Sequence, residues 1–172
     1  DNWLTQAKML VEKYRVFLVD QRNHGQSPHS DQHDYKILAE DLKNFLHENK
    51  IVAPIIICHS MGGKTAMNFA LAHPELLKVL IVVDIAPKRY PVHHDSIIEG
   101  LKSMKLEQIS SRKEADEALA SDVPEMAVRQ FLLKNLQRKE EGGFEWKINL
   151  NALDANIEAI SDGLKYEGEF EK

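Results

Sequence analysis

The order of apolar and amphipathic segments predicts an α/β fold with parallel strand pairing. Three compact apolar runs are typical of buried strands, and stretches with helical periodicity separate them. Parallel neighbours need a crossover connection, which is usually a helix. The predicted strands are Arg15–Asp20, Pro54–Cys58 and Leu77–Val83, and the predicted helices are Asn2–Leu10, Tyr35–Glu48 and Met61–Ala72.

Local chemistry supports these elements in turn. The first predicted strand reads RVFLVD, an apolar run of the kind that parallel sheets bury, and turn residues such as Gly25 and Pro28 follow it. The stretch 35–48 carries its large apolar residues on one helical stripe. The helix predicted over 61–72 is rich in small residues, and Asp84 directly follows the third strand.

Beyond Pro87 the pattern becomes helical, with no strand of comparable apolarity. Phe144–Leu150 is predicted to be a short strand or an extended linker, and the acidic tail Tyr166–Lys172 has no pattern. Pro124 suits the opening of a helix. The predicted helices here are Asp95–Met104, Arg112–Ala120, Pro124–Arg138 and Asn151–Ile160.

Composition excludes several classes of protein. The chain has 172 residues, 22 basic and 27 acidic, for a net charge of −5, which suits one domain and gives no electrostatic case for nucleic acid. No apolar run approaches the roughly 18 residues of a membrane span. The single Cys58 excludes an internal disulfide, and no metal-ligand spacing is present. The start Asp-Asn-Trp-Leu predicts that the ends are not natural gene ends.

Ser60 is the candidate nucleophile. It stands in His-Ser-Met-Gly-Gly between a predicted strand and a predicted helix, where a strained turn would expose its hydroxyl. The backbone N–H of Met61 would then begin the helix and stabilise an oxyanion. Cys58 replaces the first glycine of the pattern G-x-S-x-G, and the alternative is a loop with a bystander serine.

Asp84 is the candidate acid, because it should emerge at the same carboxyl edge of the sheet as Ser60. Its alternative role is to cap the turn before Pro87. Asp154 and Asp162 are weaker rivals, expected to be solvated residues on helix surfaces.

The general base is the missing member. In the order Ser…Asp…His only His93 and His94 follow Asp84, and a solvated pair at a helix start suits them better. His59 adjoins the candidate nucleophile and is interpreted as a packing residue. The sequence therefore predicts an incomplete catalytic triad over these residues.

Two other sites are disfavoured. Cys58 ends an apolar strand, so a buried and inert thiol is expected rather than a nucleophile. The sequence Gly62-Gly63-Lys64-Thr65 lacks the upstream glycine of a phosphate-binding loop.

Three motifs together resemble the α/β-hydrolases, in particular a branch of small serine esterases that includes YbfF-type esterases, mitochondrial abhydrolase-domain proteins and yeast ethanol acetyltransferases. They are Asp20-Gln-Arg-Asn-His-Gly-Gln-Ser27, His59-Ser-Met-Gly-Gly63 and Val83-Asp-Ile-Ala-Pro87. The resemblance implies an α/β-hydrolase fold with a helical cap, truncated at both ends. It assigns the nucleophile to Ser60 and, in some members, the acid to Asp84; others place the acid near 149–151, where this chain has Asn151.

The resemblance also implies parts that these residues lack. The His-Gly oxyanion loop and one central strand would precede residue 1, and the catalytic histidine would follow residue 172. The expected division is a partial core over 1–89, a helical cap over 90–143 and a return to the core over 144–172.

The resemblance predicts hydrolysis of short-chain esters or thioesters through an acyl-enzyme, or acyl transfer to an alcohol. The alternative is an inactive fragment or an interaction protein. No cofactor and no nucleic-acid partner are expected, the oligomeric state stays open, and the expected location is mitochondrial in a eukaryote or else cytoplasmic.

Overall fold

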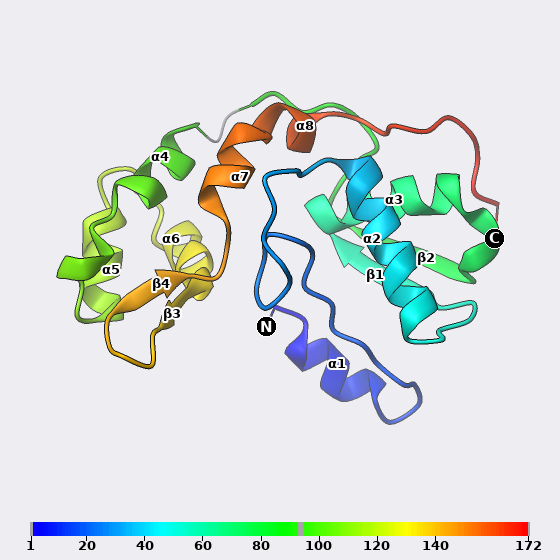
Figure 1. The fold of residues 1–172 in the computed structure, drawn as a ribbon, viewed down its shortest axis with the longest axis horizontal. Coiled ribbons are helices and arrows are strands. Elements are labelled where there is room, and N and C mark those ends of the chain that lie inside the picture. The colour runs from blue at the N-terminus through cyan, green and yellow to red at the C-terminus, as the bar shows by residue number, and fades with distance from the viewer. Residues whose placement is uncertain (1, 93–94, 172) are drawn as a thin grey trace.

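A parallel pair of strands, β1 (Ile55–His59) and β2 (Val79–Val83), forms the sheet of the first half of the chain in the computed structural model, which describes residues 2–92 and 95–171. The helix α3 (Met61–Ala72) connects the two strands and packs on them together with α2 (Tyr35–Glu48) (Figure 1). The short helix α1 (Leu4–Leu10) lies apart from this sheet. The bounds of α2 and α3 agree with those predicted from the sequence.

The two faces of this sheet differ. Ile56 and Leu80 pack against buried residues of α2 and α3, with Phe69 at the centre. Successive side chains of a strand point to opposite faces, so the other face carries the alternate positions. These side chains are exposed: Ile55, Ile57, His59, Ile81 and Val83.

The strand predicted over Arg15–Asp20 is wrong as a strand. Among the described residues the backbone of 15–19 makes no hydrogen bond, and Leu18 and Val19 are about half exposed. A strand exists only as part of a hydrogen-bonded ladder, and this segment has no neighbour to pair with. It is held to α2 by an edge-to-face contact of Phe17 with Phe45, whose ring centroids are 5.9 Å apart.

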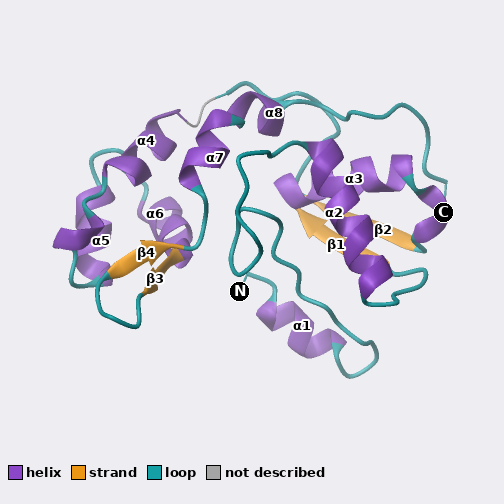
Figure 2. Ribbon diagram, in the orientation of Figure 1, coloured by secondary structure: helices purple, strands orange, loops and turns teal. Residues whose placement is uncertain are grey.

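The second half of the chain forms a separate group of short elements (Figure 2). Its two apolar clusters centre on Leu119 and Leu136, both fully buried. The elements are α4 (Asp95–Ser103), α5 (Arg112–Leu119), α6 (Met126–Leu132), β3 (Leu136–Arg138), β4 (Phe144–Trp146), α7 (Leu150–Ala155) and α8 (Ile157–Ser161), with 3-10 turns at Leu106–Gln108 and Leu133–Asn135. A further 3-10 turn, Pro74–Leu76, lies in the first half between α3 and β2.

Two helices predicted here are shorter than expected. The helix predicted over Pro124–Arg138 ends at Leu132, and Leu136–Arg138 instead pairs antiparallel with Phe144–Trp146, because Leu136 fills an apolar cluster with Phe144. The helix predicted over Asn151–Ile160 is broken at Asn156, whose side chain donates to the carbonyl oxygens of Asp31 and Ala152.

The described helices include none long and apolar enough to cross a membrane. Residues 144–155 pack against α4–α6 and their turns.

Candidate active site

Ser60 occupies a strained turn between a strand and a helix. It follows the last residue of β1 and precedes the first residue of α3, with φ 51° and ψ −124°. Such positive φ values are rare for residues other than glycine and are concentrated at functional sites. The Ser60 residue is exposed, and its amide donates to the carbonyl oxygen of Val83 at 3.2 Å. The turn thus presents the hydroxyl at the carboxyl edge of the sheet.

Unpaired amides adjoin this serine. The N–H groups of Met61 and Gly62 have no hydrogen-bond partner among the described residues, whereas those of Gly63 and Lys64 donate to the carbonyl oxygen of Ser60. Free N–H groups at the start of a helix, with the helix dipole behind them, favour negative charge. Met61 is therefore placed where the sequence predicts an oxyanion donor.

Two glycines let α3 approach its neighbours closely. A Cβ on Gly63 would lie 2.5 Å from Cγ2 of Ile85 and 3.1 Å from Cγ1 of Val82. A Cβ on Gly62 would lie 3.0 Å from Nε2 of Gln21 but 3.9 Å from Cβ of Cys58, an ordinary contact. The cysteine in place of the usual first glycine therefore fits this turn.

Cys58 itself is buried, as expected for an inert thiol. Burial raises the pKa of its thiol to about 11, and Sγ lies 3.4 Å from the carbonyl oxygen of Ile81. A thiol held in the neutral form is a poor nucleophile.

Asp84 lies where the sequence predicts it, at the same edge of the sheet as Ser60. His59 and Val83 are register partners at the ends of the two strands, so Ser60 and Asp84 directly follow neighbouring strand ends. The Asp84 side chain is 88% exposed, and its Oδ2 lies 3.7 Å from Nε2 of His59. The interpretation of His59 as a packing residue is wrong, because its side chain is on the sheet face that the helices leave exposed.

The rival carboxylates are engaged elsewhere. Asp154 pairs with Lys102 at 2.5 Å, which joins α7 to α4. Asp162 pairs with Lys165, whose hydrogen bond lowers the pKa of the Asp162 carboxyl, and it follows α8 rather than lying on it. His93 and His94 lie outside the described residues, and no hydrogen bond joins a described histidine to Ser60.

The residues that support the turn were not found from the sequence. Gln21 accepts a hydrogen bond from Oγ1 of Thr65 at 3.0 Å, and Nζ of Lys64 donates to the carbonyl oxygens of Ser161 and Asp162. The only local signal was a set of polar side chains within an otherwise apolar helix. The Lys64 ammonium is therefore engaged by these carbonyl groups.

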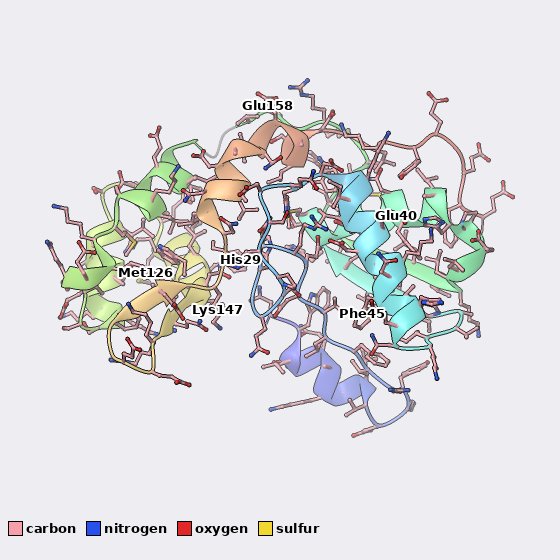
Figure 3. All side chains as sticks on the ribbon, viewed as in Figure 1. His29, Glu40, Phe45, Met126, Lys147 and Glu158 are labelled. Carbon is pink, nitrogen blue, oxygen red and sulfur yellow. The ribbon has the colours of Figure 1, made fainter. Side chains whose placement is uncertain are left out.

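A surface cavity of about 520 Å³ is lined by His29, on the loop that precedes α2, and by residues of the second half of the chain. Figure 3 labels His29 on this loop, which runs beside α7. His29 faces apolar residues of the second half across the cavity, among them Leu101, Trp146 and Ile148. No group of side chains suited to a metal ion occurs within the described part of the chain.

A strand, a serine at positive φ and a helix, then a parallel strand with an aspartate directly after it, form an arrangement typical of the α/β-hydrolase fold. The family model of the α/β-hydrolase fold matches residues 1–107, more than half of the chain. The chain belongs to this family and has the α/β-hydrolase fold.

Its relatives include named esterases and lipases. The chain is 40% identical over 168 residues to the mouse sn-1-specific diacylglycerol lipase ABHD11, covering 92% of this chain and 54% of that protein. It is 33% identical over 154 residues to the Escherichia coli esterase YbfF, covering 89% and 59%. It is 41% identical over 133 residues to a probable alcohol acetyltransferase of Saccharomyces cerevisiae, covering 72% and 39%. The chain thus spans about half the length of the curated relatives it matches.

A solved structure described as a marine microorganism esterase is similar to this chain with a TM-score of 0.92 and 43% identity, covering 97% of this chain and 66% of that one. The structure of an E-2-(acetamidomethylene)succinate hydrolase, 17% identical with a TM-score of 0.74, shows the shared fold alone.

Proposed function

We propose that this chain carries the nucleophile and the acid of a serine hydrolase that acts on short-chain carboxylic esters or thioesters. The observation that carries the proposal is the conformation of Ser60, at φ 51° between β1 and α3, beside the free N–H groups of Met61 and Gly62. The names of relatives as esterases and lipases support the same class of substrate.

The proposed reaction proceeds through an acyl-enzyme. Oγ of Ser60 attacks the carbonyl carbon, and the N–H of Met61 donates to the oxygen that becomes negative. The alcohol or thiol leaves with a proton, and water then attacks the acyl group and releases the acid. Attack by an alcohol instead of water would transfer the acyl group, as the name of the yeast relative suggests.

A histidine must take the proton from Ser60, because a serine hydroxyl is a weak nucleophile without a base. We propose that this histidine comes from outside residues 1–172 and that Asp84 orients it. The Asp84 carboxylate is open to such a partner, since it is 88% exposed and its contact with His59 is a loose 3.7 Å.

A fluorophosphonate probe tests this proposal directly, because it phosphonylates a serine that lies beside oxyanion donors. We expect slow but stoichiometric labelling, since the free N–H groups of Met61 and Gly62 act without the base. The labelling should be lost in Ser60→Ala and kept in Ser121→Ala, which alters an exposed serine. A well-folded chain that is not labelled would overturn the proposal. It would instead favour a non-catalytic protein of the same fold.

Turnover of p-nitrophenyl acetate tests the origin of the base. We expect hydrolysis near background for the 172-residue chain, since the base is proposed to be external. Robust turnover that persists in His93→Ala and His94→Ala would show that another group in the chain serves as the base.

A further inference from the structure

Lys64 is buried, and its ammonium group forms no salt bridge within the described part of the chain. It lies on α3, one turn after Ser60, and is 2% exposed. Its Nζ donates to the carbonyl oxygens of Ser161 at 3.1 Å and Asp162 at 2.5 Å, and burial lowers its pKa. Burying an ammonium group is costly unless its donors are satisfied. Filling space in the core therefore does not explain why a lysine occupies this position.

The carbonyl groups that hold Lys64 belong to the end of α8. The last carbonyl groups of a helix have no partner within that helix and attract cations. The hydroxyl of Tyr35 donates to the neighbouring carbonyl oxygen of Ile160 at 2.6 Å. Two side chains of the first half thus bind the same helix end.

Aromatic rings complete the surroundings of the ammonium group. Nζ of Lys64 lies 4.9 Å from the ring centroid of Tyr90 and 5.5 Å from that of Tyr35. Both distances are within the range of cation–π attraction. Tyr90 is in the segment that leaves β2, so Lys64 contacts this outgoing segment as well as the returning one.

The two connecting segments are also joined to each other. The amide of Tyr90 donates to the carbonyl oxygen of Ser161 at 2.8 Å, and Arg89 pairs with Glu158 at 2.6 Å. A Cβ on Gly163 would lie 3.4 Å from the backbone nitrogen of Arg89. Figure 1 shows the segment after β2 and the segment after α8 running side by side next to α3. Lys64 thus contacts both connections between the halves.

We propose that Lys64 is a positioning residue: it holds both connections of the second half against the nucleophile helix and thereby sets how that half lies over Ser60. This inference rests on the proposed hydrolase function. The backbone amide of Lys64 bonds to the carbonyl oxygen of Ser60 whatever the side chain. Loss of the side chain therefore alters how a substrate is enclosed, while the turn that carries Ser60 keeps its form.

Hydrogen exchange tests this clamp, by which we mean the contacts of the Lys64 side chain with the two connecting segments. In Lys64→Met, which keeps the length and apolar body of the side chain, we expect the amide of Tyr90 and those of α8 to exchange at least tenfold faster. The amides at the centre of α2 should be unchanged. Lys78→Met is the matched control, because this exposed lysine has no side-chain hydrogen bond or ion pair among the described residues, and it should leave both sets unchanged.

Saturation kinetics of fluorophosphonate labelling separate positioning from a merely structural role. We expect KI of Lys64→Met to rise about tenfold while the maximal labelling rate stays within twofold of wild type. Unchanged KI, or a loss confined to the maximal rate, would overturn the proposal. A lower melting temperature with unchanged KI would show a structural role only and also overturn it.

Tyr90→Leu keeps Lys64 but removes one ring, and so provides a second variant if Lys64→Met does not fold. We expect a smaller rise of KI, about threefold, with the same pattern of faster exchange in α8; no change in either would count against the clamp. If wild type is not labelled at all, the proposed function fails, and the exchange of Tyr90 and α8 alone then decides on the clamp.

Discussion

The unit β1–α3–β2 and the segment 15–34 both border the turn that carries Ser60, yet different interactions order them. The first is held by a parallel ladder and an apolar cluster around Phe69. The second has no strand or helix, and specific side-chain bonds fix it instead: Arg22 pairs with Asp41 at 2.6 and 2.8 Å, and Ser27 donates to the carbonyl oxygen of Asp20.

Asn23 is the clearest example of this second kind of order. It is fully buried with φ 65°, and its Oδ1 accepts from the amide of Ser30 and from Nδ2 of Asn149. Its carbonyl oxygen accepts from the amide of Asn149 as well. A loop beside the Ser60 turn is thus ordered by one polar residue with many hydrogen bonds, whereas the neighbouring unit is ordered by the packing of many apolar residues.

Truncating one phenylalanine in each region should give the largest difference. Phe69→Ala removes a fully buried ring and should lower the free energy of unfolding by about 3–5 kcal/mol. Phe17→Ala removes a half-buried ring that contacts Phe45 and the guanidinium of Arg15, and should cost about 1 kcal/mol. Urea unfolding at pH 7.5 measures both. Equal losses would mean that 15–34 belongs to the same apolar core as α3.

Acid should weaken the polar region through His33. The ring is 1% exposed, Asn23 is 3.3 Å from its Nδ1, and its Nε2 has no partner among the described residues. Burial lowers the pKa of His33 to about 4, with the nearby His24 and Arg22 acting in the same direction. The unfolded chain therefore takes up a proton near pH 6.5, while the folded chain stays neutral until about pH 4. Stability should fall across this window.

The size of this effect is about 2 kcal/mol between pH 7.5 and pH 5, from the two pKa values. His33→Gln retains an acceptor for Asn23 but cannot be protonated, so its unfolding free energy should fall by about 2 kcal/mol less over the same range. His47→Gln, at an exposed position of α2, is the control and should follow wild type. A His33→Gln variant with the wild-type pH dependence would contradict the assignment.

The sequence predicted the packed region far better than the polar one. Apolar periodicity located α2 and α3, because it depends only on residues close together in the chain. The two predicted parallel strands in turn placed Ser60 beside Asp84, since the ends of paired strands meet at one edge of a sheet. The segment 15–20 has an equally apolar run but no partner for a ladder, which periodicity cannot reveal.

The supporting residues of the site could not be predicted for a related reason. Lys64 is bonded to a carbonyl group 97 residues away, and Asn23 to an amide 126 residues away. A lysine in a helix normally indicates a solvated face. Only the return of the chain after α8 turns this lysine into a buried clamp.

Adjacent glycines of α3 offer the finest test of the contrast, since Gly63 faces the packed unit and Gly62 faces the polar segment. A methyl group at Gly63 would meet Ile85 at 2.5 Å and Val82 at 3.1 Å, side chains that packing holds in place. Overpacking of this kind costs about 1–3 kcal/mol, and we expect Gly63→Ala to lower the free energy of unfolding by about 2 kcal/mol.

At Gly62 the methyl group would meet Nε2 of Gln21, the far end of a flexible side chain that can move. The gain in helix propensity, about 1 kcal/mol, offsets part of the cost at either site. Gly62→Ala should therefore change the free energy of unfolding by less than about 1 kcal/mol. A larger loss at Gly62 than at Gly63 would show that Gln21 is as firmly held as the sheet, and that polar bonds here order the chain as rigidly as packing does.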